Sequence, residues 1–151
     1  MNRPPLPPAI ESAELAWHNG VPESKRFGDV YFSRDNGLEE TRHVFLRHNQ
    51  LQERFSQIRE GGSFVIAENG FGTGLNFLAA WQCWTQDSDR SGRLHFVSVE
   101  KYPLSREDMI RAHNNWPELR QLSAELCEIW PRETMLPGVH RFILGHGAVS
   151  L

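Results

Sequence analysis

Apolar residues recur along the chain at two spacings, which predicts an alternation of strands and helices. Residues 63–67 form a short, almost wholly apolar run between glycines, as expected of a parallel strand covered on both faces. Residues 75–84 then carry aromatic side chains at helical spacing. A polar turn at residues 86–92 leads to a second apolar run at residues 94–99. Strand, helix and strand in this order predict a right-handed βαβ crossover, the building block of an open α/β sheet.

The first 32 residues predict a tail followed by a small β-hairpin. Residues 1–12 are rich in proline and are expected to form a flexible tail, so that the folded part covers residues 13–151. Residues 13–17 and 26–32 are short extended candidates, and Asn19-Gly20 after the first is a turn signal. An N-terminal hairpin ahead of the sheet is therefore expected.

Two helices are expected between the hairpin and the sheet. Asn36 with Glu39 has the spacing of a capping box, so a first helix should run from there to about residue 46. Asn49 with Gln52 repeats this spacing and should begin a second helix that ends at Gly61-Gly62. Apolar residues at i, i+4 and i+7 give this second helix one buried face.

The C-terminal part predicts two more helices and two strands. Ser105 should cap a helix that runs to about residue 115, and Pro117 should open another. Residues 139–144 are expected to form a strand, and residues 148–151 to begin one more, whose edge would be unpaired. An open doubly wound sheet of about six strands needs on the order of 200 residues. We therefore expect the C-terminal half of the domain to be absent, and this chain alone not to be catalytically competent.

The composition indicates a packed globular protein without a membrane segment. Hydrophobic residues make up 39% of the chain and aromatic residues 11%, which argues against disorder. No apolar run approaches the roughly 20 residues of a membrane helix, so a cytoplasmic location is expected. Cys83 and Cys127 lie far apart and are expected to be buried thiols. His43 and His48, five apart on a helix, should not share a face, and no metal site is predicted.

The charge pattern leaves RNA binding to a local basic face. The net charge of −3 gives no overall attraction to nucleic acid. Fourteen of the sixteen basic residues are arginine, which pairs with phosphate in a bidentate manner. Positive charge is concentrated near the N-terminal helices, at Lys25, Arg26, Arg34, Arg42 and Arg47. These residues are candidates for RNA binding, and the alternative is that they form an ordinary solvated surface.

The glycine-rich segment after the first sheet strand is the strongest chemical signal. It reads Glu68-Asn69-Gly70-Phe71-Gly72-Thr73-Gly74 and lies where a parallel strand passes into a helix, the place where such sheets bind nucleotides. A dinucleotide fingerprint would need a small residue where Leu75 stands, and a phosphate loop would need a Lys-Ser or Lys-Thr pair. What remains is an acidic residue ahead of Gly-x-Gly-x-Gly, which resembles motif I of class I methyltransferases.

A second acidic residue strengthens this interpretation. Glu100 ends the next strand and can accept two hydrogen bonds from the ribose hydroxyls of an adenosine. A solvated carboxylate at a strand end is the alternative. Lys101 follows directly and can approach adenine or an RNA phosphate, although an exposed lysine is the ordinary expectation.

A series of blocks in order gives a more specific resemblance. They look like the methyltransferase domain of the MnmC family and cover nearly all of the chain after the tail. The blocks are Asp29-Val30-Tyr31-Phe32-Ser33, Asp35-Asn36-Gly37-Leu38-Glu39-Glu40-Thr41, Val44-Phe45-Leu46, Asn49-Gln50-Leu51, Glu68 to Leu78 with Asn76, Leu94-His95-Phe96, Glu100-Lys101-Tyr102-Pro103-Leu104, His113 and Trp116-Pro117-Glu118-Leu119.

The resemblance implies the N-terminal portion of a Rossmann-like class I methyltransferase that acts on tRNA. The family methylates the aminomethyl group on the wobble uridine of certain tRNAs, giving 5-methylaminomethyl-2-thiouridine, with S-adenosylmethionine as donor. Many members also carry a C-terminal FAD-dependent oxidase domain, for which nothing is encoded here. The family's Asp-Gly-Phe-x-Pro segment next to the transferred methyl group also lies beyond Leu151.

The sequence therefore predicts a set of cofactor-binding residues and, less clearly, two candidate catalytic residues. The cofactor-binding residues are Glu68, Asn69, Gly70, Gly72, Gly74, Asn76, Glu100 and Lys101. Tyr31 and Asp35 are candidates for the catalytic lip, against the simpler roles of a structural tyrosine and a turn aspartate. Two other functions stay open: an inactive fragment that binds cofactor or another chain, and a nicotinamide-dependent oxidoreductase, which Leu75 disfavours.

Overall fold

The computed structural model describes residues 10–86 and 91–151. An N-terminal hairpin is formed by β1 (Leu15–His18) and β2 (Val21–Ser24), which pair antiparallel. The hairpin is confirmed, but its second strand is not the predicted segment 26–32. Asn19 and Gly20 both have positive φ, 50° and 85°, which is the two-residue turn that returns the chain at once. Residues 1–9 of the predicted tail (residues 1–12) and residues 87–90 of the predicted turn (residues 86–92) lie outside the described residues.

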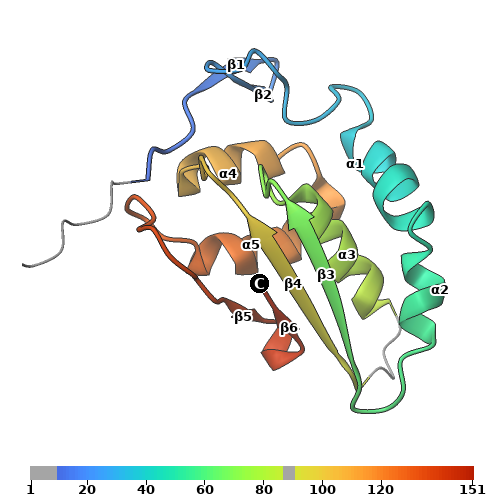
Figure 1. Ribbon diagram of the computed structural model, residues 1–151. Helices are drawn as coiled ribbons and strands as arrows, with labels where there is room; N and C mark the ends of the chain where they lie inside the picture. The colour runs from blue at the N-terminus through green and yellow to red at the C-terminus, as the bar shows by residue number, and fades with distance from the viewer. Residues whose placement is uncertain (1–9, 87–90) are drawn as a thin grey trace, which may run out of the picture.

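A four-stranded sheet forms the centre of the molecule (Figure 1). Its order is β3 (Ser63–Asn69), β4 (Arg93–Val99), β6 (Val149–Ser150) and β5 (Ile143–Leu144). The first three strands are parallel, which confirms the βαβ unit, and β5 runs antiparallel to β6. The predicted unpaired edge is wrong, because the last strand lies between β4 and β5, and the edge strands are β3 and β5. The strand predicted at residues 139–144 is reduced to its last two residues.

Helices cover one face of this sheet. They are α3 (Leu75–Thr85), α4 (Arg106–His113), the 3₁₀ turn η2 (Pro117–Leu119) and α5 (Arg120–Ile129). Ser105 caps α4 as predicted, since its hydroxyl accepts from the Asp108 amide at 3.1 Å. A second 3₁₀ turn, η3 (Gly145–Gly147), joins β5 to β6.

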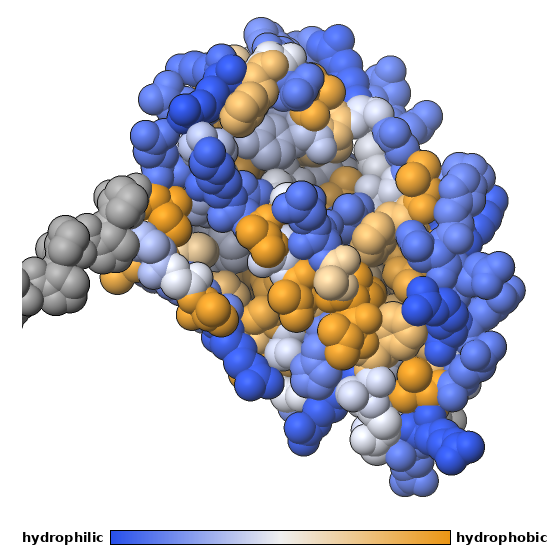
Figure 2. Space-filling view, viewed as in Figure 1, coloured by the Kyte–Doolittle hydropathy of each residue, from blue (hydrophilic) through white to orange (hydrophobic). Residues whose placement is uncertain are grey.

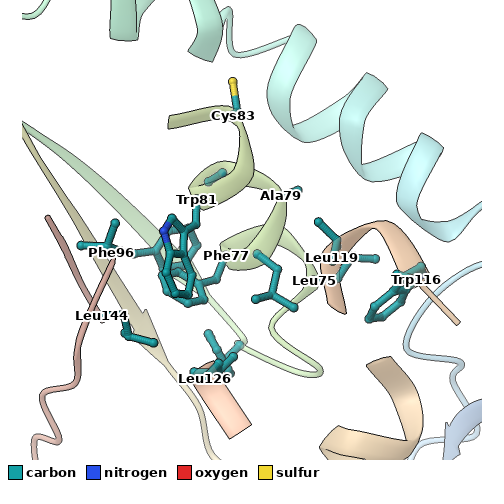
Figure 3. Close-up of a cluster of buried hydrophobic side chains, with 14 of the residues drawn as sticks. Leu75, Phe77, Ala79, Trp81, Cys83, Phe96, Trp116, Leu119, Leu126 and Leu144 are labelled. Atoms are coloured by element: carbon teal, nitrogen blue, oxygen red, sulfur yellow. The ribbon is translucent and has the colours of Figure 1, made fainter. Parts of the chain in front are cut away.

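The core lies between these helices and the sheet. Figure 3 shows Phe77 and Trp81 of α3 beside Phe96 of β4, and the rings of Phe77 and Phe96 meet edge to face with centroids 5.2 Å apart. Phe77 and Phe96 are almost fully buried, as is Leu126 of α5. Cys83 and Cys127 are buried free thiols, as predicted.

The opposite face of the sheet is open. Val65 of β3 is 60% exposed, and Val97 and Val99 of β4 are 55% and 67% exposed. Figure 2 shows apolar side chains gathered over this face. The prediction that residues 63–67 form a strand covered on both faces is therefore wrong for the described chain.

The segment between the hairpin and the sheet is helical but differs in detail from the prediction. It consists of α1 (Gly37–Glu40), η1 (Thr41–Arg47) and α2 (Leu51–Ser56). Neither predicted capping box forms: the Asn36 side chain makes no capping bond, and the Asn49 amide donates to the Phe45 carbonyl. The N-cap of α2 is instead Gln50, in the left-handed conformation with a φ of 52°.

The η1 segment is a π-helix, which corrects the prediction for its two histidines. The His48 amide donates to the His43 carbonyl, a bond from i+5 to i, so residues five apart become neighbours. The two rings accordingly stack edge to face with centroids 4.6 Å apart. No helix within residues 10–86 and 91–151 is long and apolar enough to cross a membrane.

Candidate functional site

The turn between β3 and α3 needs glycine for steric reasons. Gly70, Gly72 and Gly74 have φ values of 90°, 55° and 74°, in the left-handed region that other residues avoid. A Cβ on Gly74 would also lie 2.7 Å from the ring of Phe71. Because Gly74 is the N-cap of α3 and makes no side-chain capping bond, the first amides of that helix stay available to a ligand.

Glu68 lies on the helix-covered side of this turn. Its carboxylate accepts from the Asn76 side-chain amide at 2.9 Å and from the Ser98 hydroxyl at 3.0 Å. Burial raises the pKa of Glu68, and the nearby Glu100 carboxylate adds to the rise. The two hydrogen bonds act in the opposite direction. The residue therefore fixes the start of α3 to β4 rather than facing the open cavity.

Glu100 joins the turn to the end of β4. One carboxylate oxygen accepts from the Gly72 amide at 2.9 Å, and the other accepts from the Tyr102 amide at 2.8 Å. Each oxygen keeps a second lone pair for a further donor. Glu100 can thus hold the turn and still receive hydroxyl groups from a ligand.

A cavity of about 980 Å³ opens in front of the turn. Its walls come from the turn, from Glu100, from the loop at residues 29–33, and from α1 and η1. Most of the sequence-predicted residues line it, namely Tyr31, Asn69, Gly70, Gly72, Asn76 and Glu100.

The other predicted residues lie outside this lining. Glu68 and Gly74 stand at the two ends of the glycine-rich segment and do not line the cavity. Asp35 is exposed and does not line the cavity. Lys101 is exposed and extends over the Tyr102 ring, 5.2 Å from its centroid. The structure therefore gives Asp35 and Lys101 no place in the cavity wall.

Tyr31 forms the lip opposite the turn. A Cβ on Gly72 would lie 3.3 Å from the Tyr31 ring, so the tyrosine packs directly against the glycine. Burial raises the pKa of Tyr31, and the carboxylates of Glu100 and Asp108 raise it further. Tyr31 is consequently a neutral phenol at physiological pH and can donate a hydrogen bond, but it is not a general base.

Sequence reasoning missed the wall contributed by η1. Thr41, Val44 and Phe45 line the cavity, and Phe71 completes its apolar part. A regular α-helical repeat does not predict which residues of a π-helix share a face. The Val44-Phe45-Leu46 block, one of the blocks that carry the family resemblance, is the feature of the sequence that could have indicated this part of the wall.

A buried histidine is hydrogen-bonded to the backbone of the glycine turn. His113 is 5% exposed, and its Nε2 lies 2.7 Å from the Thr73 carbonyl oxygen. Because a carbonyl only accepts, Nε2 carries a hydrogen; the other ring nitrogen, Nδ1, lies 2.6 Å from the Ser123 hydroxyl. Burial lowers the pKa of His113, while the bond to the Thr73 carbonyl raises it.

Cys127 completes this buried group. Its sulfur lies 3.6 Å from His113 Nδ1, a partner that sequence reasoning had not identified. Burial raises the pKa of the Cys127 thiol, so the thiol stays protonated and is not a nucleophile at neutral pH. Neither here nor elsewhere in the described chain is a group of three or more acidic, histidine or cysteine residues arranged to hold a metal ion.

Known proteins resemble this chain over most of its length. The tRNA 5-methylaminomethyl-2-thiouridine biosynthesis bifunctional protein MnmC of Chromobacterium violaceum is 56% identical over 139 residues, which are 92% of this chain and 21% of that protein. The protein of the same name from Marinobacter nauticus is 53% identical over 148 residues, 96% of this chain and 23% of that protein. No family model matches the chain.

A solved structure supports the fold. The crystal structure of MnmC2 from Aquifex aeolicus matches with a TM-score of 0.58 and 20% identity, over 93% of this chain and 41% of that chain. At this identity the match bears on the fold alone, and it confirms the predicted Rossmann-like α/β architecture. The chain spans about a fifth of the length of the curated relatives. It therefore belongs to the MnmC family, as a partial segment that corresponds to the N-terminal part of those proteins.

Proposed function

We propose that this chain forms the cofactor-binding part of a methyltransferase that uses S-adenosylmethionine to modify the wobble uridine of tRNA. The observation that carries this proposal is the meeting of the glycine turn and Glu100 in the wall of one cavity. The names of the relatives support the tRNA pathway, and the donor is inferred from the geometry of the site. S-adenosylmethionine would supply an activated methyl group.

The residues of the cavity fit this cofactor. Glu100 has free lone pairs for the ribose hydroxyls, and the apolar side chains of Phe45 and Phe71 offer a surface for adenine. The Gly70 turn lets a ligand approach the backbone closely, since a Cβ there would meet nothing within 4 Å. Two carboxylates, Glu68 and Glu100, give this end of the sheet a negative potential that suits a cationic ligand.

The residues of this chain can position a substrate more readily than they can move a proton. A neutral Tyr31 at the lip can donate to a ligand and exclude water from the cavity. Methylation of an unprotonated amine depends mainly on alignment and desolvation, so such positioning is the contribution expected here. The acceptor proposed is the aminomethyl group of the uridine, and an FAD-dependent oxidase domain would lie outside this chain.

Isothermal calorimetry with purified protein tests cofactor choice. S-adenosylhomocysteine, the demethylated product, is expected to bind, and NADH is not, because Leu75 fills the position where a dinucleotide turn needs a small residue. Binding of NADH without binding of S-adenosylhomocysteine would overturn the proposal.

A pair of matched variants tests the role of Glu100. Glu100→Ala should weaken S-adenosylhomocysteine binding by about ten- to a hundredfold, because it removes charge-assisted hydrogen bonds to the ribose. Glu60→Ala, an exposed glutamate ahead of β3, should leave the affinity unchanged. Equal affinities of the two variants would remove Glu100 from the site.

A second candidate function, cofactor binding without catalysis, is favoured by the open face of the sheet. Val97 and Val99 are exposed where a complete doubly wound domain would carry a second layer. Transfer of radiolabelled methyl groups to tRNA bearing 5-aminomethyl-2-thiouridine separates the two functions. Turnover by this chain supports catalysis, and S-adenosylhomocysteine binding without turnover supports the second candidate.

A further inference from the structure

A second cavity lies behind the cofactor turn and is rich in arginine. It has a volume of about 530 Å³ and is formed by α4, η2 and α5. Arg106, Arg120 and Arg132 line it, with Glu128 as the one carboxylate of the lining. Three guanidinium groups against one carboxylate make this cavity positive in a chain whose net charge is −3.

These arginines differ from Arg26 and Arg42 of the N-terminal segments. Arg26 lies 2.7 Å from the Glu11 carboxylate, and Arg42 pairs with Glu39 and approaches Glu118, so their charges are partly neutralised. Within residues 10–86 and 91–151, no salt bridge joins Arg106, Arg120 or Arg132 to an acidic group. Pairing therefore weakens two of the five residues of the predicted N-terminal basic face, whereas its other three, Lys25, Arg34 and Arg47, have no salt bridge in these residues. All three arginines of this cavity carry unpaired positive charge.

Some residues that line this cavity also contact the residues of the cofactor site. His113 and Ser123 line it, and the same His113 ring bonds the Thr73 carbonyl of the glycine turn. Trp116 also lines it, and its ring meets the Phe32 ring edge to face at 4.7 Å. Phe32 lines the cofactor cavity, so the contact between Phe32 and Trp116 separates the two cavities.

We propose that this arginine cavity binds a phosphate group of the RNA backbone and so holds the substrate beside the cofactor site. The proposal rests on the proposed function, in which tRNA is the substrate. Arginine suits this task because its planar fork makes paired hydrogen bonds to phosphate oxygens. A cavity of this size accepts one phosphate with part of its nucleotide, so it fixes the position of the strand without reading its sequence.

The test measures tRNA binding at several salt concentrations for matched variants. Replacing Arg106, Arg120 and Arg132 together by glutamine should weaken binding by about tenfold or more, and should lower the slope of log K against log salt by about one, as expected for one lost phosphate contact. The control replaces Arg59, Arg93 and Arg141, three exposed arginines outside both this cavity and the predicted basic face, by glutamine. Equal losses in the two triple variants would overturn the proposal, because they would show a general charge effect.

Binding of S-adenosylhomocysteine is measured for every variant, which separates this inference from the proposed function. Retained cofactor binding with weakened tRNA binding supports the arginine cavity, and retained binding of both overturns it. If the triple variant loses cofactor binding, Arg120→Gln alone is decisive, because this exposed side chain can be changed without disturbing the core. That variant should weaken tRNA binding about threefold or more and leave S-adenosylhomocysteine binding unchanged.

Small phosphates distinguish the source of the ligand. Inorganic phosphate and adenosine monophosphate should compete with tRNA only at concentrations far above the tRNA dissociation constant, since each offers a single contact. A small phosphate that binds as tightly as tRNA, with arginine-dependent affinity, would make this a metabolite site and overturn the assignment to RNA.

Discussion

The two faces of the central sheet carry similar residues but differ in their cover. Along β4, Leu94 and Phe96 are 0% and 1% exposed beneath α3, whereas Val97 and Val99 are 55% and 67% exposed. Strands that are apolar on both sides are typical of sheets with a helical layer on each face. The apolar composition of β4 is thus typical of a strand with helices packed on both faces. In the described chain, helices pack on one face only.

The covered face should dominate the stability of the protein, and a pair of substitutions tests this. Phe77→Ala should reduce the free energy of unfolding by about 3–5 kcal/mol, because it removes a fully buried ring and leaves a cavity. Val97→Ala on the open face should change it by less than about 0.5 kcal/mol. Urea denaturation followed by circular dichroism measures both, and similar losses for the two variants would contradict the comparison.

On the covered face, His113 also fixes the glycine turn, because its ring donates to the Thr73 carbonyl. The His113→Phe variant measures how much this hydrogen bond contributes to stability. The change should cost about 1–3 kcal/mol at pH 8, because the buried Thr73 carbonyl loses its donor. The folded state lowers the pKa of His113 below its ordinary value of 6.5. The stability that neutral His113 contributes is therefore fully present above pH 6.5 and is lost as the pH falls through the folded-state pKa.

Urea unfolding at a series of pH values measures this dependence. The difference in unfolding free energy between the native chain and His113→Phe should be largest at pH 8 and should shrink toward acid pH. Other titrating groups are common to both proteins and cancel in the difference. If the difference stays constant across the series, His113 contributes to stability through packing alone and not through its protonation state.

The smallest effect is expected on the open face itself. Val97→Lys should change the free energy of unfolding by less than about 0.5 kcal/mol, because the side chain already meets solvent. It should also lower the fluorescence of a dye that binds apolar surface. Leu136→Lys, at a 72% exposed leucine in a loop, is the control and should leave the dye signal unchanged. A loss of more than about 2 kcal/mol for Val97→Lys would mean that this face is covered in solution.

The elements that sequence predicted well are those whose signals lie close together in the chain. The βαβ unit follows from apolar runs and from the glycines between them, and the Ser105 cap depends on an amide three residues away. Errors arose where two local signals competed. The capping pattern at Asn49 was overridden because its side chain bonds back to Phe45, which leaves Gln50 to begin α2.

Part of the candidate site was also predictable. The glycine turn and Glu100 meet in one cavity wall, because each ends a strand of the same parallel pair and such ends meet at one edge of the sheet; their binding of a cofactor stays a prediction. Asp35 and Lys101 do not line this cavity, because whether a neighbour of a lining residue faces inward depends on the path of the loop. The wall from Thr41, Val44 and Phe45 depended on a π-helical register that a 3.6-residue period does not predict.

The sequence by itself determined the parallel strand pair, the left-handed glycine turn and the burial of both cysteines, since backbone sterics and apolar periodicity act over a few residues. Only the tertiary structure decided that Glu100 accepts from the Gly72 amide and that His113 donates to the Thr73 carbonyl. It also decided that the last strand lies inside the sheet, with β3 and β5 at its edges. These contacts join residues 28 and 40 positions apart. Their partners are chosen by packing of the whole chain, which no local pattern encodes.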